Sequence, residues 1–357
     1  MNTEKPIRPD SDDSMPAGME RYSKESLHYR ITPNGVQCQI CPNNCMLREG
    51  MKGICRTHMA LENKLYTIAY GNPCSVHIDP IEKKPLFHFL PASECLSIAT
   101  AGCNLSCKNC QNWEISQRSP IDVSNFELFP AQVVEEAIKH GCKSIAYTYT
   151  EPTVFFEYAS DTAIIAKERG IKNLMISNGY INEIPLRALA KNLDAANIDL
   201  KSFSGETYKK LFGGSLQPVL NTLLILKEAG VWLEITNLLI PGLTNGEDSL
   251  IQMCMWLVAN GFAGTPLHFS RFHPMHKLTG IPVTPIQTLE KAREIAISAG
   301  MQYVYIGNVA GTTWQHTYCP ICKKPVIERF GYSIAANNIK NGVCKFCNTQ
   351  ISGVWGP

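Results

Sequence analysis

Between residues 95 and 310 the chain alternates short apolar runs with longer segments in which apolar residues recur every three or four positions. Short β-branched runs bounded by turn residues indicate buried strands, whereas a period of 3.6 residues indicates amphipathic helices. Their alternation predicts βα units around a parallel sheet. The predicted strands are 96–100, 144–149, 173–177, 195–199, 232–238, 267–271 and 303–306.

The segments between these strands carry the start and stop residues of helices. Pro130 precedes the first predicted helix and Gly141 follows it, where proline favours initiation and glycine favours termination. Six or seven βα units are too few for a closed eight-stranded barrel, so we expect an α/β fold with an open, partial (β/α)6-type barrel over residues 91–311. The predicted helices are 131–140, 153–169, 183–192, 215–229, 247–260 and 285–299.

Composition argues against several classes of protein. The 357 residues carry a net charge of +2 and no long basic run, so we expect no nucleic-acid partner. No apolar segment approaches the roughly 20 residues of a membrane span. Residues 1–25 are polar, of mixed charge and without the apolar stretch of a signal peptide. We therefore expect a disordered N-terminal segment and a cytoplasmic protein.

Fifteen cysteines are many for a cytosolic protein, in which they more often bind metal or do chemistry than form disulfides. Eleven of them fall into three clusters with regular spacings, and each cluster predicts a metal site. The other four stand among apolar residues and are expected to be small core side chains. They are Cys74, Cys95, Cys142 and Cys254.

The central cluster follows the first predicted strand of the barrel and has the spacing C-x3-C-x2-C. It consists of Cys103, Cys107 and Cys110. Three thiolates can hold three irons of a [4Fe–4S] cluster and leave the fourth iron open to a ligand. The alternative is a zinc loop or three unrelated buried thiols.

A second cluster, in the module of residues 26–90, has the spacing C-x2-C-x3-C-x9-C and is followed by a predicted strand at 64–71. Zinc there would be structural, whereas an auxiliary iron–sulfur cluster would carry electrons. Zinc is favoured because it is the commoner use of such spacings, and the iron–sulfur alternative stays open. The ligands are Cys38, Cys41, Cys45 and Cys55.

The prolines and mixed charges of residues 79–89 predict an extended loop rather than a helix. Within this segment His88 stands between two phenylalanines, and we assign it no functional role.

The third cluster lies in residues 312–357 and consists of two C-x2-C pairs with 21 residues between them. This pattern is typical of a zinc ribbon, and we expect ribbon strands at 326–329 and 331–332. A rubredoxin-like single iron fits the same spacing, but zinc is favoured. The ligands are Cys319, Cys322, Cys344 and Cys347.

Polar residues follow nearly every predicted strand of the barrel. Because the carboxyl ends of parallel strands share one face, these residues should converge on the face that bears the central cysteine cluster. The sequence therefore predicts a ligand site there. Among these residues are Thr150, Glu151, Ser177, Asn178, Asp199, Lys201, Arg271 and His273.

From about residue 36 to residue 357, the chain resembles the radical S-adenosylmethionine (SAM) enzyme of the AmmeMemoRadiSam system, which is itself similar to pyruvate formate-lyase-activating enzymes. The cysteine clusters carry the resemblance together with residues 79–89, 111–116, 147–152, 199–202, 268–274 and 353–355. The resemblance implies that the open iron binds the amino and carboxylate groups of SAM.

The resemblance also assigns roles to the strand-end residues. The family's Gly-Gly-Glu-Pro motif, which meets the SAM amino group, is Tyr149-Thr150-Glu151-Pro152 here, so only its last two residues match. Asn109 stands where the family usually has an aromatic residue beside adenine, so that ring contact is lost. The implied SAM-binding residues are Asn109, Thr150, Glu151, Ser177, Asn178, Asp199, Lys201, Arg271 and His273.

The implied chemistry is reductive. A one-electron reductant of the flavodoxin or ferredoxin type reduces the cluster, and SAM is cleaved to methionine and a 5′-deoxyadenosyl radical that takes hydrogen from a substrate. The first hypothesis is a protein substrate, such as a glycyl-radical protein, and the resemblance further implies association with Memo-like and AMMECR-like proteins.

Two alternative functions stay open. One is a radical SAM enzyme that modifies a small molecule, because the two additional cysteine modules could close over the barrel mouth. The other is an electron-transfer or scaffold protein whose cluster never meets SAM. The convergence of polar strand ends argues against this last function, because an electron carrier has no need of them.

Overall fold

One eight-stranded sheet organises the computed structural model, which describes residues 15–356. The strand order is β14-β13-β12-β11-β10-β9-β8-β7, and all neighbours from β8 to β14 are parallel, whereas β7 runs antiparallel to β8. Since β7 and β14 do not pair with each other, the barrel stays open on one side. The bounds are β7 Ser75–Pro80, β8 Glu94–Ala99, β9 Ser144–Tyr147, β10 Lys172–Ser177, β11 Ala195–Asp199, β12 Trp232–Leu239, β13 Leu267–Arg271 and β14 Val304–Gly307.

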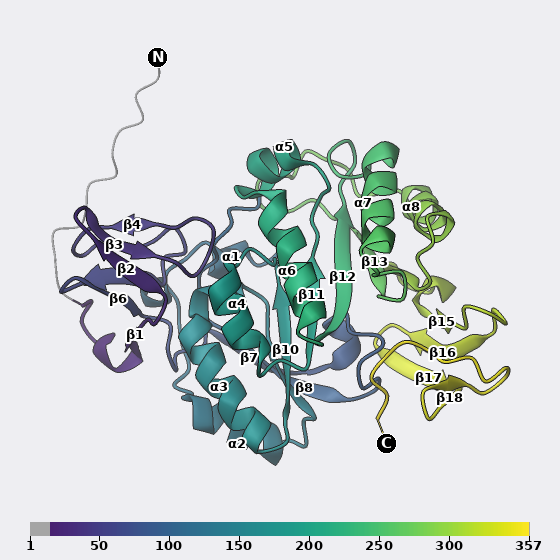
Figure 1. Cartoon of the computed structure of the whole chain (residues 1–357), viewed down its shortest axis with the longest axis horizontal. Helices are drawn as coiled ribbons and strands as arrows, with labels where there is room; N and C mark the ends of the chain where they lie inside the picture. The colour runs from purple at the N-terminus through teal and green to yellow at the C-terminus, as the bar shows by residue number, and fades with distance from the viewer. Residues whose placement is uncertain (1–14, 357) are drawn as a thin grey trace.

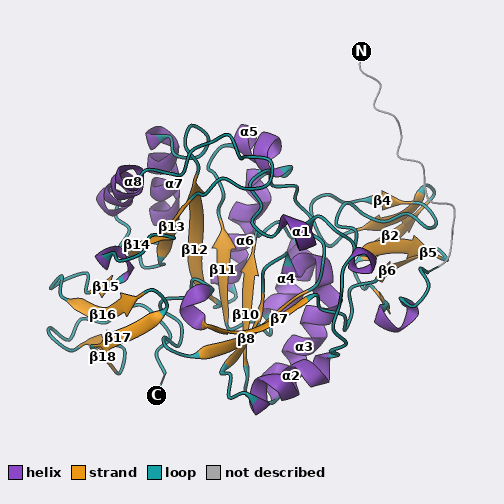
Figure 2. Cartoon of the chain, turned by 180° about the vertical axis from the view of Figure 1, so that it is seen from behind, coloured by secondary structure: helices purple, strands orange, loops and turns teal. Residues whose placement is uncertain are grey.

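Helices cover the outer face of this sheet, as Figure 1 shows from the helix side and Figure 2 from behind. The longer helices turn an apolar stripe toward the strands; on α6, for example, Val219, Leu223 and Leu226 are fully buried. The bounds are α1 Trp113–Ser116, α2 Pro130–Lys139, α3 Phe156–Glu168, α4 Glu183–Ala190, α5 Gly205–Thr207, α6 Leu216–Glu228, α7 Glu247–Ala259 and α8 Ile286–Ser298. Six single turns of other helix types complete the set, namely η1 Glu20–Tyr22, η2 Ile81–Lys83, η3 Pro120–Asp122, η4 Pro152–Phe155, η5 Tyr208–Phe212 and η6 Thr313–Gln315.

The predicted βα alternation is confirmed, and the strands at 195–199 and 267–271 have their predicted bounds. The prediction missed β7, α5 and η5. It also treated residues 79–89 as a loop without helix, which is wrong because η2 forms one 3₁₀ turn at residues 81–83. Pro80 holds an extended conformation with ψ of 143° and so precedes that turn without interrupting it.

Two small three-stranded sheets form the N-terminal module on one flank of the barrel (Figure 1), in the orders β2-β3-β4 and β1-β6-β5. The expected disorder of residues 1–25 is wrong for residues 15–25, because β1 pairs with β6 and Met19 packs against Met59 and Ile68. Residues 1–14 lie outside the described part of the chain. The bounds are β1 Lys24–Glu25, β2 Tyr29–Thr32, β3 Gly35–Cys38, β4 Met46–Leu47, β5 His58–Leu61 and β6 Lys64–Thr67.

The C-terminal module lies on the other flank and contains the sheet β15-β16-β17 and the hairpin β18-β19 (Figure 2). The predicted strand at 326–329 is part of β16. The predicted strand at 331–332 is wrong, because Gly331 has a φ of +61° and these two residues form the turn between β16 and β17. The bounds are β15 Thr317–Tyr318, β16 Pro325–Phe330, β17 Ser333–Asn337, β18 Ile339–Lys340 and β19 Val343–Cys344.

The segment of residues 81–90, which links β7 to β8, forms the floor of the barrel. Glu234, near the start of β12, is fully buried and accepts hydrogen bonds from the backbone N–H groups of Phe87 (3.0 Å) and His88 (2.7 Å). His88 is a packed side chain, with its ring nitrogens 2.6 Å from Ser352 O and 2.5 Å from the Tyr305 hydroxyl.

The C-terminal module docks against this floor and against β14. The Arg329 guanidinium on β16, fully buried, donates to Phe87 O at 2.6 Å. The Val354 N–H donates to His88 O at 2.7 Å, and the Leu90 N–H donates to Val354 O at 2.8 Å. None of the helices in the described part of the chain has the length and apolar character needed to span a membrane.

We expect Arg329→Ala to lower the free energy of unfolding by about 1–3 kcal/mol, because the Phe87 and Gln315 carbonyls would lose a buried charged donor. The matched control is Arg187→Ala, which removes an exposed arginine with two exposed glutamate partners and should leave the free energy of unfolding nearly unchanged. Urea unfolding of both variants measures the difference. Equal effects of the two substitutions would contradict the docking role of Arg329.

Candidate active site

A cavity of about 920 Å³ occupies the inside of the open barrel. The loop of the central cysteine cluster lies at one end, at the carboxyl ends of the strands, and the barrel floor lies at the other. Strand residues facing inward make the wall between them. Among the lining residues are Cys103, Cys107, Asn109, Cys110, Thr150, Ser177, Asn178, Asp199 and Lys201, all of which the sequence predicted for the site.

Backbone contacts fix the loop that carries the three cysteines. The Ser106 N–H donates to Phe212 O at 2.9 Å and the Lys108 N–H donates to Leu211 O at 3.0 Å. These two bonds attach the loop to η5. Gly102 has a φ of +106°, and a Cβ atom there would lie 2.6 Å from Cys55 O. Only glycine allows this close approach between the loop and the N-terminal module.

The three thiols share one buried space. Burial raises the pKa of Cys103 well above its ordinary value, and the nearby Glu151 and Cys107 raise it further. Burial likewise raises the pKa of Cys107 to about 11. Thiols in such surroundings remain protonated without a cation, and binding a metal displaces their protons.

Asn178 presents its amide to the cysteine loop. Its Nδ2 donates to Asn104 Oδ1 at 2.9 Å and lies 3.8 Å from Cys103 Sγ. Glu151 stands behind this residue, fully buried, with Oε2 accepting from the Asn178 N–H at 2.8 Å and Oε1 accepting from the Ser177 hydroxyl at 2.7 Å. Glu151 therefore positions the wall of the cavity and has its carboxylate occupied by protein donors.

Asp199 and Lys201 form an ion pair on the wall, with 2.7 Å between Lys201 Nζ and Asp199 Oδ2. Burial alone would lower the pKa of Lys201, but the Asp199 carboxylate and the Cys107 sulfur raise it above the ordinary value. The lysine is therefore a permanent cation beside the cysteine cluster.

Three predicted SAM-binding residues do not line the cavity, namely Glu151, Arg271 and His273. The Arg271 Nε donates to Thr284 O at 2.8 Å, and His273 is exposed; neither lines the cavity. Their expected contact with SAM stays a prediction without geometric support. Asn109 does line the cavity, and its Oδ1 is buried without a hydrogen-bond partner.

Sequence reasoning missed the inward-facing residues deeper in the barrel. They are Glu82, Lys84, Asn197, Thr236, His268, Ser270 and Tyr305. Those on the strands could have been found by alternation, because residues i and i+2 of a strand share a face. Asn197 stands two positions before Asp199, and Ser270 follows His268 by two. Glu82 and Lys84 gave no signal, because the floor segment was predicted only as an extended loop.

The C-terminal cysteines converge. Their four Sγ atoms lie within 4.8 Å of one another, with 3.5 Å between Cys319 and Cys347 and 3.7 Å between Cys322 and Cys344. In residues 15–356 no other group of three or more cysteine, histidine or acidic side chains is as tight. Of the cysteines expected in the core, Cys95, Cys142 and Cys254 are buried, whereas Cys74 is half-buried.

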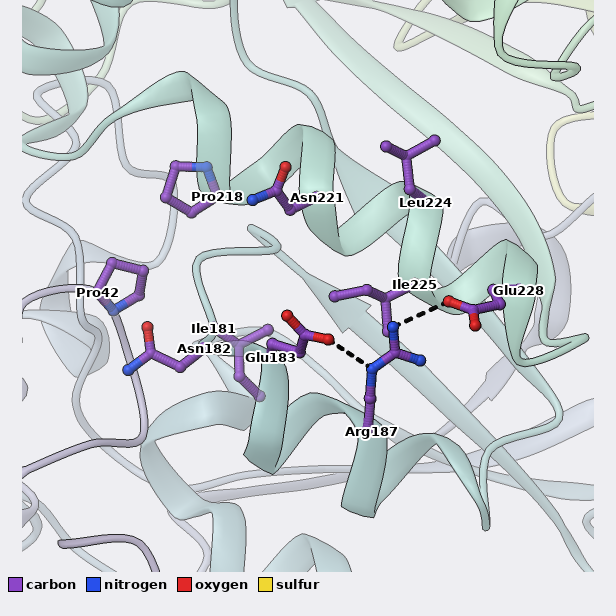
Figure 3. A pocket seen from close by; sticks show the side chains of 10 residues that line it. All are labelled: Pro42, Ile181, Asn182, Glu183, Arg187, Pro218, Asn221, Leu224, Ile225 and Glu228. Carbon is purple, nitrogen blue, oxygen red and sulfur yellow. Dashed lines mark hydrogen bonds and ion pairs between the residues drawn. The ribbon is translucent and has the colours of Figure 1, made fainter.

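A second, smaller hollow of about 350 Å³ lies outside the barrel between α4 and α6 (Figure 3). Arg187 is paired there with Glu183 and Glu228 at 2.8 and 2.9 Å, so its charge is already satisfied. Because this charge is already paired, the hollow offers a ligand no free charged group from Arg187, and we do not assign it a function.

Comparison with known proteins gives matches of three kinds. Residues 97–254 match the model of the radical SAM superfamily. An uncharacterized protein of Methanocaldococcus jannaschii is 45% identical over 331 residues, which span 92% of this chain and 98% of that protein.

Two solved structures have similar folds. A domain of the pyruvate-formate lyase-activating enzyme from Bacteroides vulgatus is 16% identical with a TM-score of 0.40, over 46% of this chain and 99% of that one. A radical SAM methyltransferase from Sphaerobacter thermophilus is 12% identical with a TM-score of 0.48, over 63% and 68% of the two chains. At these identities and scores the likeness says nothing about substrate.

We expect Glu151→Ala to disturb the cavity wall, because Asn178 N–H and Ser177 Oγ would lose their acceptor. Leaving these buried donors unpaired should lower the free energy of unfolding by about 1–3 kcal/mol. Glu151→Gln keeps one oxygen acceptor and should cost less. Thermal unfolding of the two variants provides the measurement. A wild-type melting temperature for Glu151→Ala would show that the carboxylate does not stabilise the cavity wall.

Proposed function

We propose, because this chain belongs to the radical SAM superfamily, that it is an enzyme in which a [4Fe–4S] cluster at Cys103, Cys107 and Cys110 cleaves SAM reductively. The observation that carries this proposal is the shared cavity: the three thiols face the same space as the polar residues at the carboxyl ends of β10 and β11.

The residues present fit these two groups. Three thiols and no fourth cysteine line the cavity, which suits a cluster with one open iron. The unpartnered Asn109 Oδ1 offers an acceptor for a donor such as the adenine amino group of SAM. When bound, the cluster gives one electron to the SAM sulfonium, and cleavage yields methionine and a 5′-deoxyadenosyl radical that takes hydrogen from a substrate.

This chain's own residues bind and orient. The Asn178 amide, held by Glu151 and Asn104, donates toward the cysteine loop and fixes that end of the cavity. Asp199 can accept from hydroxyl groups such as those of the SAM ribose, and Lys201 can pair with a carboxylate. The floor and the C-terminal module enclose the far end of the cavity, which limits the access of water to a reactive radical.

Two classes of substrate are candidates. The first is a protein segment, as the resemblance to activating enzymes suggests. The second is a small molecule, and the depth of the cavity favours it. The space continues beyond the SAM-binding residues to His268, Tyr305 and Tyr332, the last of which belongs to the C-terminal module. Anaerobic reaction with SAM and either a metabolite extract or protein fractions, followed by mass spectrometry, distinguishes the two.

We further propose that the C-terminal module binds one zinc ion. Tetrahedral zinc with Zn–S bonds of about 2.3 Å separates its sulfur ligands by about 3.8 Å. The Sγ–Sγ distances of 3.5 and 3.7 Å at this site are close to that value. Since the module docks on the floor and its four cysteines do not line the cavity, this zinc would be structural.

Replacing Cys103, Cys107 and Cys110 together by alanine should abolish formation of 5′-deoxyadenosine from SAM in the presence of dithionite, because the cluster would lose all its thiolates. Chromatographic assay of 5′-deoxyadenosine measures the effect. The matched control is Cys254→Ala, which removes a buried cysteine far along the chain on α7 and should retain cleavage. Undiminished cleavage by the triple variant would refute the proposed function.

Asp199→Ala should weaken SAM binding by about ten-fold or more, because one charged contact to a polar ligand contributes on the order of 1.5–3 kcal/mol. The iron content should stay unchanged. Equilibrium dialysis with labelled SAM measures the affinity, and the exposed Asp248→Ala on α7 serves as the control. If Asp199→Ala bound SAM normally but unfolded more easily, Asp199 would be a structural residue.

A further inference from the structure

We propose that Cys38, Cys41, Cys45 and Cys55 hold a second [4Fe–4S] cluster, which passes electrons to the cluster of the active site. The presence of this second cluster goes beyond the proposed function and is independent of it. Only the direction of electron flow rests on the proposed function.

The spacing of the sulfur atoms argues for a cluster rather than zinc. One tetrahedral ion brings its four sulfur ligands to about 3.8 Å from one another, and the C-terminal module has that spacing. No three of the N-terminal cysteine sulfurs come within 4.8 Å of one another. In a cubane each thiolate binds a different iron, so its sulfur ligands lie farther apart than around one ion.

The active-site cysteines provide an internal comparison. Cys103, Cys107 and Cys110 also fail to bring three sulfurs within 4.8 Å, although their loop is the one that superfamily membership assigns to a [4Fe–4S] cluster. In the described residues, only the C-terminal group brings its sulfurs within 4.8 Å of one another. The preference for zinc drawn from the sequence motif alone is therefore not supported by the geometry.

The four N-terminal cysteines nevertheless face one common space. The Cys38 N–H donates to Cys45 O at 3.0 Å, which places these two residues across β3 and β4 from each other. A Cβ atom at Gly53 would lie 3.5 Å from Cys55 Sγ and 3.6 Å from Cys45 Sγ. Both thiols therefore border the same position, and they are within reach of a common metal cluster.

The module joins the active-site loop on both sides of Cys103. Before it, Gly102 packs so closely against Cys55 O that a Cβ would lie 2.6 Å away. After it, Asn104 O accepts from Asn43 Nδ2 at 2.8 Å, and the Asn104 side chain is a hydrogen-bond partner for Cys41. Single residues thus separate ligands of the two clusters, which is the proximity that direct electron transfer requires.

Polar groups next to the N-terminal cysteines suit a redox centre, because hydrogen bonds to the sulfurs tune the potential of a cluster. The Thr57 hydroxyl lies 3.2 Å from Cys55 Sγ, and His58 Nδ1 lies 3.7 Å from the same sulfur. The other ring nitrogen of His58 lies 3.1 Å from Glu157 Oε2 on α3, so the ring is held in place by the barrel.

The electron balance is simple. A reduced donor of the ferredoxin or flavodoxin type gives one electron to the N-terminal cluster, which changes from the 2+ to the 1+ state. That electron then reduces the active-site cluster from 2+ to 1+ and restores the N-terminal cluster. Each SAM cleavage consumes one such electron.

The full-length protein, prepared anaerobically with ⁵⁷Fe, tests the presence of the cluster. The variant with Cys103, Cys107 and Cys110 replaced by alanine should retain about four irons per chain with the Mössbauer spectrum of a [4Fe–4S] cluster. Its reduced form should give an electron paramagnetic resonance signal that SAM does not alter. If this triple variant contained no iron but two zinc ions per chain, the proposal would be overturned. This conclusion would not depend on whether the wild type cleaves SAM.

The matched variant Cys41→Ser/Cys45→Ser should lose about four irons and keep the SAM-sensitive signal of the active-site cluster. Cys319→Ser/Cys322→Ser should instead lose one zinc and keep the full iron content. If the first of these variants does not fold, freeze-quenched samples of the wild type decide the relay. The SAM-insensitive signal should appear before the SAM-sensitive one when reduced flavodoxin is added, and the reverse order would overturn the relay.

Discussion

The buried carboxylate of Glu234 is the contact on which the inner architecture depends. It is fully buried, and its oxygens accept hydrogen bonds from two consecutive backbone N–H groups of the floor and lie 2.6 Å from His268 Nε2. Burial by itself would raise the pKa of Glu234, but His268 lowers it below the ordinary value. A charged acceptor at this point holds the floor against β12, because leaving a buried charge unpaired would cost several kcal/mol.

The floor in turn positions the C-terminal module. It presents the Phe87 and His88 carbonyls to Arg329 and Val354. At the opposite flank, the N-terminal module packs on the cysteine loop through Gly102 and Asn104. The three cysteine groups therefore differ in their surroundings. The C-terminal group is tight and does not line the cavity, whereas the N-terminal and active-site groups lie next to each other.

Much of the barrel could be predicted from the sequence, because its strands and helices follow simple apolar periods and end at glycine or proline. The polar strand ends Ser177, Asn178 and Asp199 could be predicted for the same reason. Contacts between distant segments could not. The local sequence does not indicate that the Glu151 carboxylate would accept hydrogen bonds from its neighbours, or that His273 would be exposed. Nor does it indicate that the floor segment would line the inside of the barrel. The four-cysteine spacings likewise do not distinguish one metal ion from a cluster, since that depends on how far apart the folded loops hold the sulfurs.

The C-terminal module lines part of the cavity with residues that follow the whole sheet in the chain. During synthesis, β7 to β14 emerge first, and domains generally begin to fold from the N-terminal side. Gln315, Gly331 and Tyr332, which line the cavity, are made after all eight strands of the sheet. The wall of the cavity is therefore complete only after Arg329 and Val354 have docked the C-terminal module on the floor.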